Sequence, residues 1–217
     1  MMLNWLDLAP GSVPAFARWH NAEHLPERVA LPGFRRGARY HATSAAPPRG
    51  QSVLIVYEAD RPEAFASAAY LARLNDPTPQ TRTMVPKLRN VSRMVCRIVD
   101  CAGQGLGGWL LVTRLRQAEN VTMSALRAGP GVLSASLGLS MPDLAAAKDT
   151  TREGHMTRAQ DNPASGCLVV HLTAARAAGQ LATAIPGLSA TEATLYRLEA
   201  ALDRHDWQPS TPEGTCL

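Results

Sequence analysis

One order of predicted strands and helices occurs twice along the chain and divides the sequence near residue 105. Alternating or β-branched runs predict strands, and apolar residues at helical spacing predict helices. In the first half the expected strands are Leu3–Leu8, Phe34–Thr43, Ser52–Glu58 and Asn90–Val99, with one helix from Ser12 to the Pro32-Gly33 stop and another over Pro62–Asn75. In the second half the expected strands are Trp109–Leu115, Val132–Ser140, Cys167–Leu172 and Thr191–Ala200, with helices over Val121–Ala128 and Ala174–Ile185. Each half therefore follows the order β-α-β-β-α-β.

Similar turns also recur in the two halves. The sequences are Leu-Pro-Gly-Phe at 31–34, Gly-Pro-Gly-Val at 129–132 and Ile-Pro-Gly-Leu at 185–188. A β-α-β-β-α-β unit is the ferredoxin-like arrangement. We expect an α+β fold in which two tandem ferredoxin-like halves, 1–101 and a degenerate 109–204, form one pseudo-symmetric α/β barrel. The glycine-rich segment 102–108 is the expected linker, and 205–217 the expected flexible tail.

Composition narrows the class of protein. The 217 residues are 46% hydrophobic and 18% charged, which is typical of a globular domain. The net charge of +4 comes from scattered arginines and lysines, so we expect no nucleic-acid partner. The N-terminus does not resemble a signal peptide, and no apolar run approaches the ~20 residues that span a membrane. Because the four cysteines lack metal-ligand spacing, we expect reduced thiols and a cytoplasmic location, with no membrane association.

The segment Trp19–Arg28 carries the densest group of reactive side chains. His20, Glu23 and His24 lie within five residues of an expected helix and formally match the zinc signature H-x-x-E-H. Residues four apart share a helical face, so the two imidazoles could in principle hold one metal. However, Pro26 follows at once, and the expected helix over Pro62–Asn75 offers no suitable third ligand. We therefore predict no metal site.

The same segment carries a resemblance. The run W-H-N-x-E-H-L-P-E-R at 19–28, followed by Pro-Gly-Phe at 32–34 and Ala-Arg-Tyr at 38–40, resembles the first helix and second strand of the dimeric α/β-barrel superfamily. Within it, the stretch is similar to EthD-like and related uncharacterised bacterial proteins, as are the segment 74–79, Arg89-Asn90 and Arg93. The second half has no Glu-His-Leu-Pro equivalent. The resemblance implies a small-molecule site between sheet and helices, with a histidine on the first helix.

His24 matches that histidine best, which makes it the candidate acid–base residue of an isomerase, cyclase or cofactor-free oxygenase. Glu23 is a second catalytic candidate. Ligand-binding neighbours are expected at Trp19, His20, Arg39 and Tyr40, and the ligand is a small organic molecule. Strict alternation along Phe34–Thr43 places Phe34, Arg36, Ala38 and Tyr40 on one face of the strand, and Arg35, Gly37, Arg39 and His41 on the other.

An alternative stays open, in which the chain is a non-catalytic ligand-binding or structural protein. The polar cluster then forms a hydrogen-bonded network that fixes the helix to the strand through Arg35 or Arg39. No cofactor is expected, and haem is not predicted because its only second-half candidate ligand, His171, lies in an apolar strand. A homodimer is favoured over a monomer, although a monomer is feasible.

Overall fold

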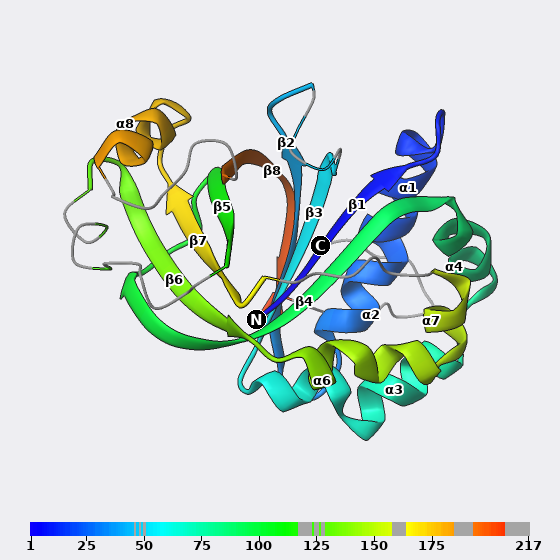
Figure 1. Cartoon of the computed structure of the whole chain (residues 1–217). Coiled ribbons are helices and arrows are strands. Elements are labelled where there is room, and N and C mark those ends of the chain that lie inside the picture. The colour runs from blue at the N-terminus through cyan, green and yellow to red at the C-terminus, as the bar shows by residue number, and fades with distance from the viewer. Residues whose placement is uncertain are drawn as a thin grey trace.

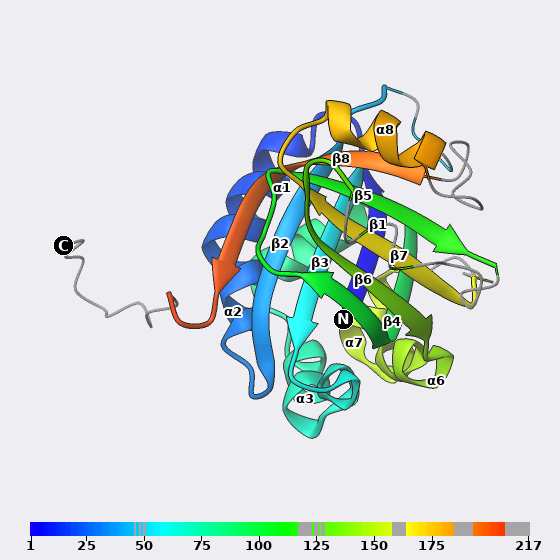
Figure 2. The same cartoon turned by 90° about the vertical axis from the view of Figure 1, so that its left-hand side faces the viewer.

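The computed structural model describes residues 1–45, 47, 49, 51–116, 123, 126, 129–157, 164–184 and 193–206, with 182–184 described by their backbone alone. Its strands form a closed antiparallel barrel in the order β1-β3-β2-β8-β5-β7-β6-β4 (Figures 1 and 2). The strands are β1 Met2–Leu8, β2 Phe34–Ala42, β3 Val53–Ala59, β4 Leu88–Gly103, β5 Trp109–Leu115, β6 Val132–Ser140, β7 Gly166–Leu172 and β8 Ala193–Asp203. The expected α+β class and the eight expected strands are thus confirmed.

Both halves of the chain arrange their strands in the same order. The first four strands lie in the order β4-β1-β3-β2, and the last four lie in the order β8-β5-β7-β6. Two long strands join these groups. β4 pairs with β1 through Leu88–Val95 and with β6 through 96–103, while β8 pairs with both β5 and β2. β4 is longer than the expected Asn90–Val99 and includes Ala102 and Gly103, the first two residues of the expected linker.

The Pro-Gly turns before β2 and β6 have the same geometry. Gly33 has φ +82° and Gly131 has φ +75°, values that glycine adopts without steric cost. In both turns the amide of the first strand residue donates to the carbonyl three residues earlier, Phe34 to Leu31 at 3.1 Å and Val132 to Gly129 at 3.2 Å. The third turn, at 185–188, lies outside the described residues. So does the expected helix Val121–Ala128, apart from Met123 and Leu126, and most of the expected tail.

Helices cover the outer face of the first-half strands (Figure 1). The expected first helix is α1 Val13–Trp19, the π-helical turn η1 His20–His24 and α2 Leu25–Val29. The expected helix Pro62–Asn75 is instead the 3₁₀ segment η3 Pro62–Ala66 and α3 Ala68–Asn75, divided at Ser67, whose side chain caps α3. Five further helical segments were not predicted from the sequence: α4 Pro79–Met84, η4 Val85–Lys87, α6 Pro142–Ala146, η6 Ala147–Thr150 and α7 Arg152–Met156. The expected helix Ala174–Ile185 is α8 Arg176–Ala184.

The first-half sheet has apolar residues on both faces. Inward-facing residues such as Leu54, Ala38 and Tyr40 fill the barrel, and residues such as Ile55 and Phe16 pack between the sheet and the helices. Phe34 packs with the helices, so the predicted face shared by Phe34, Ala38 and Tyr40 is wrong. The reason is a register shift between Phe34 and Arg36 in the β2–β3 pairing, which reverses the alternation.

Two of the cysteines meet inside the barrel. Cys96 and Cys167 are buried free thiols with their sulfurs 3.6 Å apart, whereas Cys101 is exposed and Cys216 lies outside the described residues. Gly138 on β6 leaves room for this contact, because a Cβ there would lie 2.7 Å from the Cβ of Cys96. Among the described residues, no helix has both the length and the apolar character required to cross a membrane.

Candidate functional site

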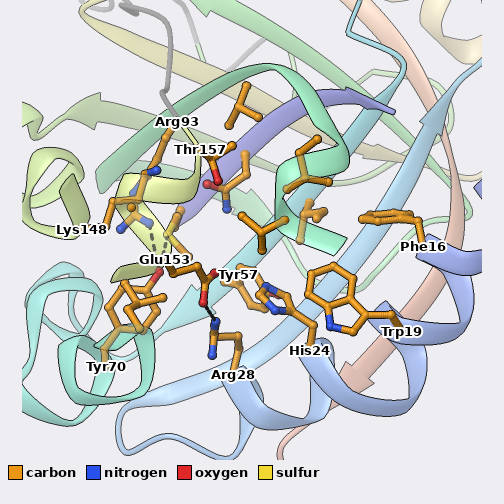
Figure 3. A pocket seen from close by; sticks show the side chains of 18 residues that line it. Phe16, Trp19, His24, Arg28, Tyr57, Tyr70, Arg93, Lys148, Glu153 and Thr157 are labelled. Carbon is orange, nitrogen blue, oxygen red and sulfur yellow. Dashed lines mark hydrogen bonds and ion pairs between the residues drawn. The ribbon is translucent and has the colours of Figure 1, made fainter. Parts of the chain in front are cut away.

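A cavity of about 80 Å³, here called the inner cavity, lies between the first-half sheet and the helices that cover it (Figure 3). β1, β3 and β4 form its floor, and the α1–α2 helix and α3 form its walls. Residues of the second half, from η6 to just beyond α7, close it. Its polar and aromatic lining includes Phe16, Trp19, His24, Arg28, Tyr57, Tyr70, Arg93, Lys148 and Glu153.

His24 lies at the end of the π-helical turn. The amide of Leu25 donates to the carbonyl of His20, five residues earlier, instead of to the usual fourth residue. Pro26 follows, and its ring nitrogen has no hydrogen to continue the ordinary ladder. The wider turn thus occurs where the sequence cannot make a regular α-helical bond, and it places His24 among the cavity-lining side chains.

The imidazole of His24 makes no hydrogen bond within the described part of the chain. Its ring packs against that of Trp19, with centroids 4.4 Å apart, and Nδ1 is buried without a hydrogen-bond partner among the described residues. Burial, followed by the nearby charge of Arg28, holds the pKa of His24 well below its ordinary value of 6.5. The ring is therefore neutral at pH 7 and has a lone pair available to accept a proton.

Two donors that make no hydrogen bond with the described residues line the same cavity, although Glu27 Oε2 lies 3.7 Å from one of them, Nη1 of Arg28. The hydroxyl of Tyr57 and Nη1 of Arg28 are both buried and make no hydrogen bond within the described part of the chain. Burial raises the pKa of Tyr57, so the phenol remains protonated and able to donate. Because buried polar groups are normally paired, these two donors suit an oxygen atom of a bound molecule.

Positive charge predominates around the cavity. Arg93 donates from Nη1 to the hydroxyl of Tyr70 at 3.0 Å and keeps a buried Nε without a described partner. Burial, and then the charge of Arg93, lowers the pKa of Lys148. Glu153 is the one carboxylate among the lining residues, against three cationic side chains: Arg28, Arg93 and Lys148. This balance favours a ligand that carries or develops negative charge.

Glu23, the second catalytic candidate, lies outside the cavity lining. Its Oε1 accepts hydrogen bonds from Trp19 Nε1 at 3.1 Å, from Thr81 Oγ1 at 3.0 Å and from the hydroxyl of Thr78. Thr78 is also the N-cap of α4, since its hydroxyl accepts the amide of Thr81. In this arrangement Glu23 anchors the first helix to the start of α4.

His20 and Arg39 belong to a separate buried network. Nη1 of Arg39 lies 3.1 Å from Nδ1 of His20 and donates to Oδ1 of Asn21 at 2.8 Å, while its Nε donates to Glu199 at 3.0 Å. Burial, and then the charge of Arg39, lowers the pKa of His20 to about 3. This geometry is the one expected for a network fixing the helix to β2. The guanidinium occupies Nδ1 of His20, while Nε2 is buried without a hydrogen bond to the described residues. No described group of three ligating side chains could hold a metal.

Tyr40 and His171 lie away from His24. Tyr40 faces the barrel interior, on the opposite side of β2 from Arg39. Its ring centroid is 6.5 Å from that of His171, whose Nδ1 accepts the amide of Gly107 at 3.3 Å. Of the expected site residues, the structure thus brings His24 and Trp19 together at the inner cavity and separates Glu23, His20, Arg39 and Tyr40 from it.

Several residues that line the inner cavity were not predicted as site residues from the sequence. Arg28 is four residues after His24 on the same helix, and Tyr57 alternates with inward-facing residues on β3. Their spacing could therefore have placed both side chains between the sheet and the first helix. Lys148 and Glu153 come from helices that the sequence analysis did not predict. No local sequence pattern predicts that the segment containing Lys148 and Glu153 packs against the first-half helices.

Comparison with known proteins supports the fold. No model of a known protein family matches the chain, and no curated protein sequence matches it. Among solved structures it is similar to an anthrone oxidase-like protein, with a TM-score of 0.55 and 9% identity over 97% of this chain and 95% of that chain. A "putative monooxygenase" from Fusobacterium nucleatum has a TM-score of 0.49 and 10% identity, over 93% of this chain and 94% of that one. At such identities the first likeness shows a shared barrel-type fold.

Proposed function

We propose that the protein is a small-molecule enzyme that removes a proton from an oxygen-bearing organic substrate in the inner cavity. His24 is the base, and Tyr57 and Arg28 hold the substrate oxygen. The observation that carries this proposal is the convergence on one cavity of a neutral imidazole nitrogen, a phenol and a guanidinium nitrogen, all buried and without a hydrogen bond to the described residues. A base and two oxygen-directed donors are the groups that proton abstraction beside a carbonyl requires.

The reaction class follows from what the deprotonated substrate does. Loss of a proton next to a carbonyl gives an enolate, whose oxygen charge is stabilised by Tyr57 and Arg28. Return of a proton at another carbon gives isomerisation, attack of the enolate carbon on a second carbonyl of the same molecule gives cyclisation, and capture of dioxygen gives an oxygenase reaction without a cofactor. The oxygenase is the version we favour, because a similar solved structure is that of an anthrone oxidase-like protein.

The cavity volume limits the reacting part of the substrate. A cavity of roughly 150 Å³ holds one benzene molecule, so a volume of about 80 Å³ admits a smaller group without rearrangement. A substrate with several rings must therefore place most of its body elsewhere or move a wall residue.

We further propose that the chain is a tandem ferredoxin-like repeat of the dimeric α/β-barrel superfamily, near its EthD-like members. The identical strand order in both halves and the matching turns at Gly33 and Gly131 support this assignment. A homodimer in the cytoplasm remains our expectation. Light scattering on the full chain would test the dimer.

The proposed reaction can be tested by deuterium exchange, which reports proton removal whatever happens next. Anthrone and acetylacetone serve as enolisable probes in deuterated buffer, with oxygen uptake recorded in parallel. We expect wild-type protein to accelerate exchange of at least one probe, and His24→Ala to slow it by about 10²-fold or more. Because His24 makes no hydrogen bond with the described residues, the same variant should lose only about 1 kcal/mol of stability, mainly its contact with the Trp19 ring.

Two further variants complete the test. Tyr57→Phe should slow exchange about tenfold through loss of one oxygen donor. His155→Ala, which changes an exposed histidine on α7, is the matched control and should leave exchange unchanged. Equal exchange in wild type and His24→Ala would exclude His24 as the base. Tight binding of a probe without any exchange would favour the non-catalytic, ligand-binding alternative.

A further inference from the structure

A second and larger cavity, here called the outer cavity, lies at the other end of α1. Its volume is about 520 Å³, within the range of small-molecule sites. α1 covers it, and the ends of β1, β2, β3 and β8 form its walls. Its apolar lining includes Leu8, Phe16 and Val53. Phe16 also lines the inner cavity, so this residue borders both.

Arg39 lines the outer cavity with a guanidinium that the described residues engage only in part. Its side chain is 4% exposed, and its Nε and Nη1 bond to Glu199, His20 and Asn21. Nη2 has no hydrogen-bond partner in the described part of the chain. Because a guanidinium has five N–H donors, those on Nη2 are available to an acceptor in the cavity.

Two more nitrogen-bearing side chains lie beside Arg39. His41 is two residues further along β2, on the same face, and is paired directly with Arg197 of β8. Arg197 is exposed and makes no ion pair among the described residues. All three residues line the outer cavity, and since neighbouring strands are about 4.8 Å apart and residues two apart on a strand about 6.8 Å, they are neighbours on its wall.

The two acidic residues that line the outer cavity are both bonded to neighbouring groups. Glu199 is paired with Arg39, and Oδ1 of Asp7 accepts the amide of Ser52 at 3.0 Å as well as its hydroxyl. Asp7 is on β1, which β3 and β2 separate from β8. At about 4.8 Å per strand, Asp7 is therefore about 14 Å from the strand of Arg197.

We propose that the outer cavity is a binding site for an aromatic carboxylate. The carboxylate lies against Nη2 of Arg39 and the guanidinium of Arg197, and the ring lies against Leu8, Phe16 and Val53. Charge complementarity at this part of the wall and the apolar remainder together select a flat apolar body with one anionic end. This site does not depend on the reaction proposed for His24.

Binding of 2-naphthoate to the full chain, measured by titration calorimetry, tests the proposal. The neutral comparison is 2-naphthalenemethanol, which has the same rings without the charge. We expect wild type to bind 2-naphthoate, and Arg197→Gln to weaken that binding about tenfold while leaving the neutral compound unchanged. Arg82→Gln, which removes an exposed charge on α4, is the matched control and should have no effect.

A second variant tests the location of the site without altering a charged residue. Ala17→Trp fills the outer cavity from α1 and should abolish 2-naphthoate binding, whereas His24→Ala at the inner cavity should not change it. Absence of 2-naphthoate binding by wild type would overturn the proposal. Equal affinity of wild type and Arg197→Gln, or loss of binding in His24→Ala alone, would also overturn it.

Discussion

Nη2 of Arg28 donates to Oε2 of Glu153 at 2.6 Å, joining two residues that are 125 positions apart in the chain. Arg28 belongs to α2 and is 2% exposed; Glu153 belongs to α7, and its side chain is 14% exposed. This ion pair fixes the second-half segment across the helices of the first half and closes one side of the inner cavity (Figure 3).

Glu153→Gln is expected to destabilise the fold by about 2–3 kcal/mol. The substitution leaves the buried guanidinium of Arg28 with only the more distant carboxylate of Glu27, 3.7 Å from Nη1, and breaking a buried pair from one side costs more than the pair itself contributes. Urea unfolding followed by circular dichroism measures the change. The midpoint should fall without a large change in slope.

Glu63→Gln is the matched control for that experiment. Glu63 pairs with Arg97 at 3.6 Å, but both side chains are more than half exposed. Its loss should change stability by less than about 0.5 kcal/mol. Equal effects of the two substitutions would mean that the Arg28–Glu153 pair does not hold α7 in place.

The fold could be predicted largely because hydrophobic periodicity is local. Strands such as Trp109–Leu115 and Val132–Ser140 have the bounds that their alternation predicts. The errors arose where a single residue changes the periodicity. The bulge beside Phe34 reverses a face, Ser67 divides a helix, and the π-turn before Pro26 alters the helical spacing. None of these three features changes the number of apolar residues in its segment, so the hydrophobic pattern does not reveal them.

The site was less predictable because it is assembled from distant segments. His24 was identified from its helix and resemblance, and it does line a cavity. Glu23 lies in the same sequence motif, yet its carboxylate accepts hydrogen bonds from Trp19 and from two threonines at the start of α4, a helix that was not predicted. Which side chains remain unpaired depends on tertiary contacts, and a sequence pattern carries no information about those.

Gly37→Ala is expected to disturb the inner cavity through its floor. A Cβ at Gly37 would lie 2.4 Å from Cδ1 of Leu25 and 2.8 Å from Cε1 of Tyr57. The ring of Tyr57 must then shift toward the cavity, which moves the proposed oxygen donor. We expect a stability loss of about 1–3 kcal/mol, read from urea unfolding, together with slower substrate exchange.

Gly108→Ala controls for the loss of glycine itself, because a Cβ there meets nothing within 4 Å. This variant should unfold within about 0.5 kcal/mol of wild type and keep full exchange activity. If Gly37→Ala behaved in the same way, contact between β2 and Tyr57 would not determine the shape of the cavity.

Acidification is expected to destabilise the protein through His20. Its pKa is lowered from 6.5 to about 3, so below pH 6.5 the unfolded chain binds a proton that the folded chain does not. Stability contributed by the neutral ring is complete above pH 6.5 and is lost as the pH falls toward 3. At pH 5 the loss from this group is about 2 kcal/mol. Urea midpoints measured between pH 7 and pH 5 give the slope.

His20→Asn identifies the source of that slope. Asparagine retains an acceptor for Arg39 but does not titrate, so the dependence of stability on pH should become shallower. His155→Asn alters an exposed histidine and should keep the wild-type slope. An unchanged slope in His20→Asn would show that other groups cause the acid sensitivity.

Phe16→Leu is expected to open a path between the inner and outer cavities. The Phe16 ring is 2% exposed and lines both cavities, and it packs against His20 and the guanidinium of Arg39. Because leucine is smaller and not planar, the variant should lose about 1–2 kcal/mol of stability and bind anthracene-2-carboxylate more tightly than wild type. Urea unfolding measures the stability. Titration calorimetry measures the affinities, with 2-naphthoate as the shorter probe whose affinity should change little.

Val13→Ala trims an exposed side chain at the outer cavity alone and should leave stability and the affinities for both probes close to wild type. Weaker binding of the three-ring probe by Phe16→Leu would show that the ring of Phe16 is part of the binding surface and not a partition.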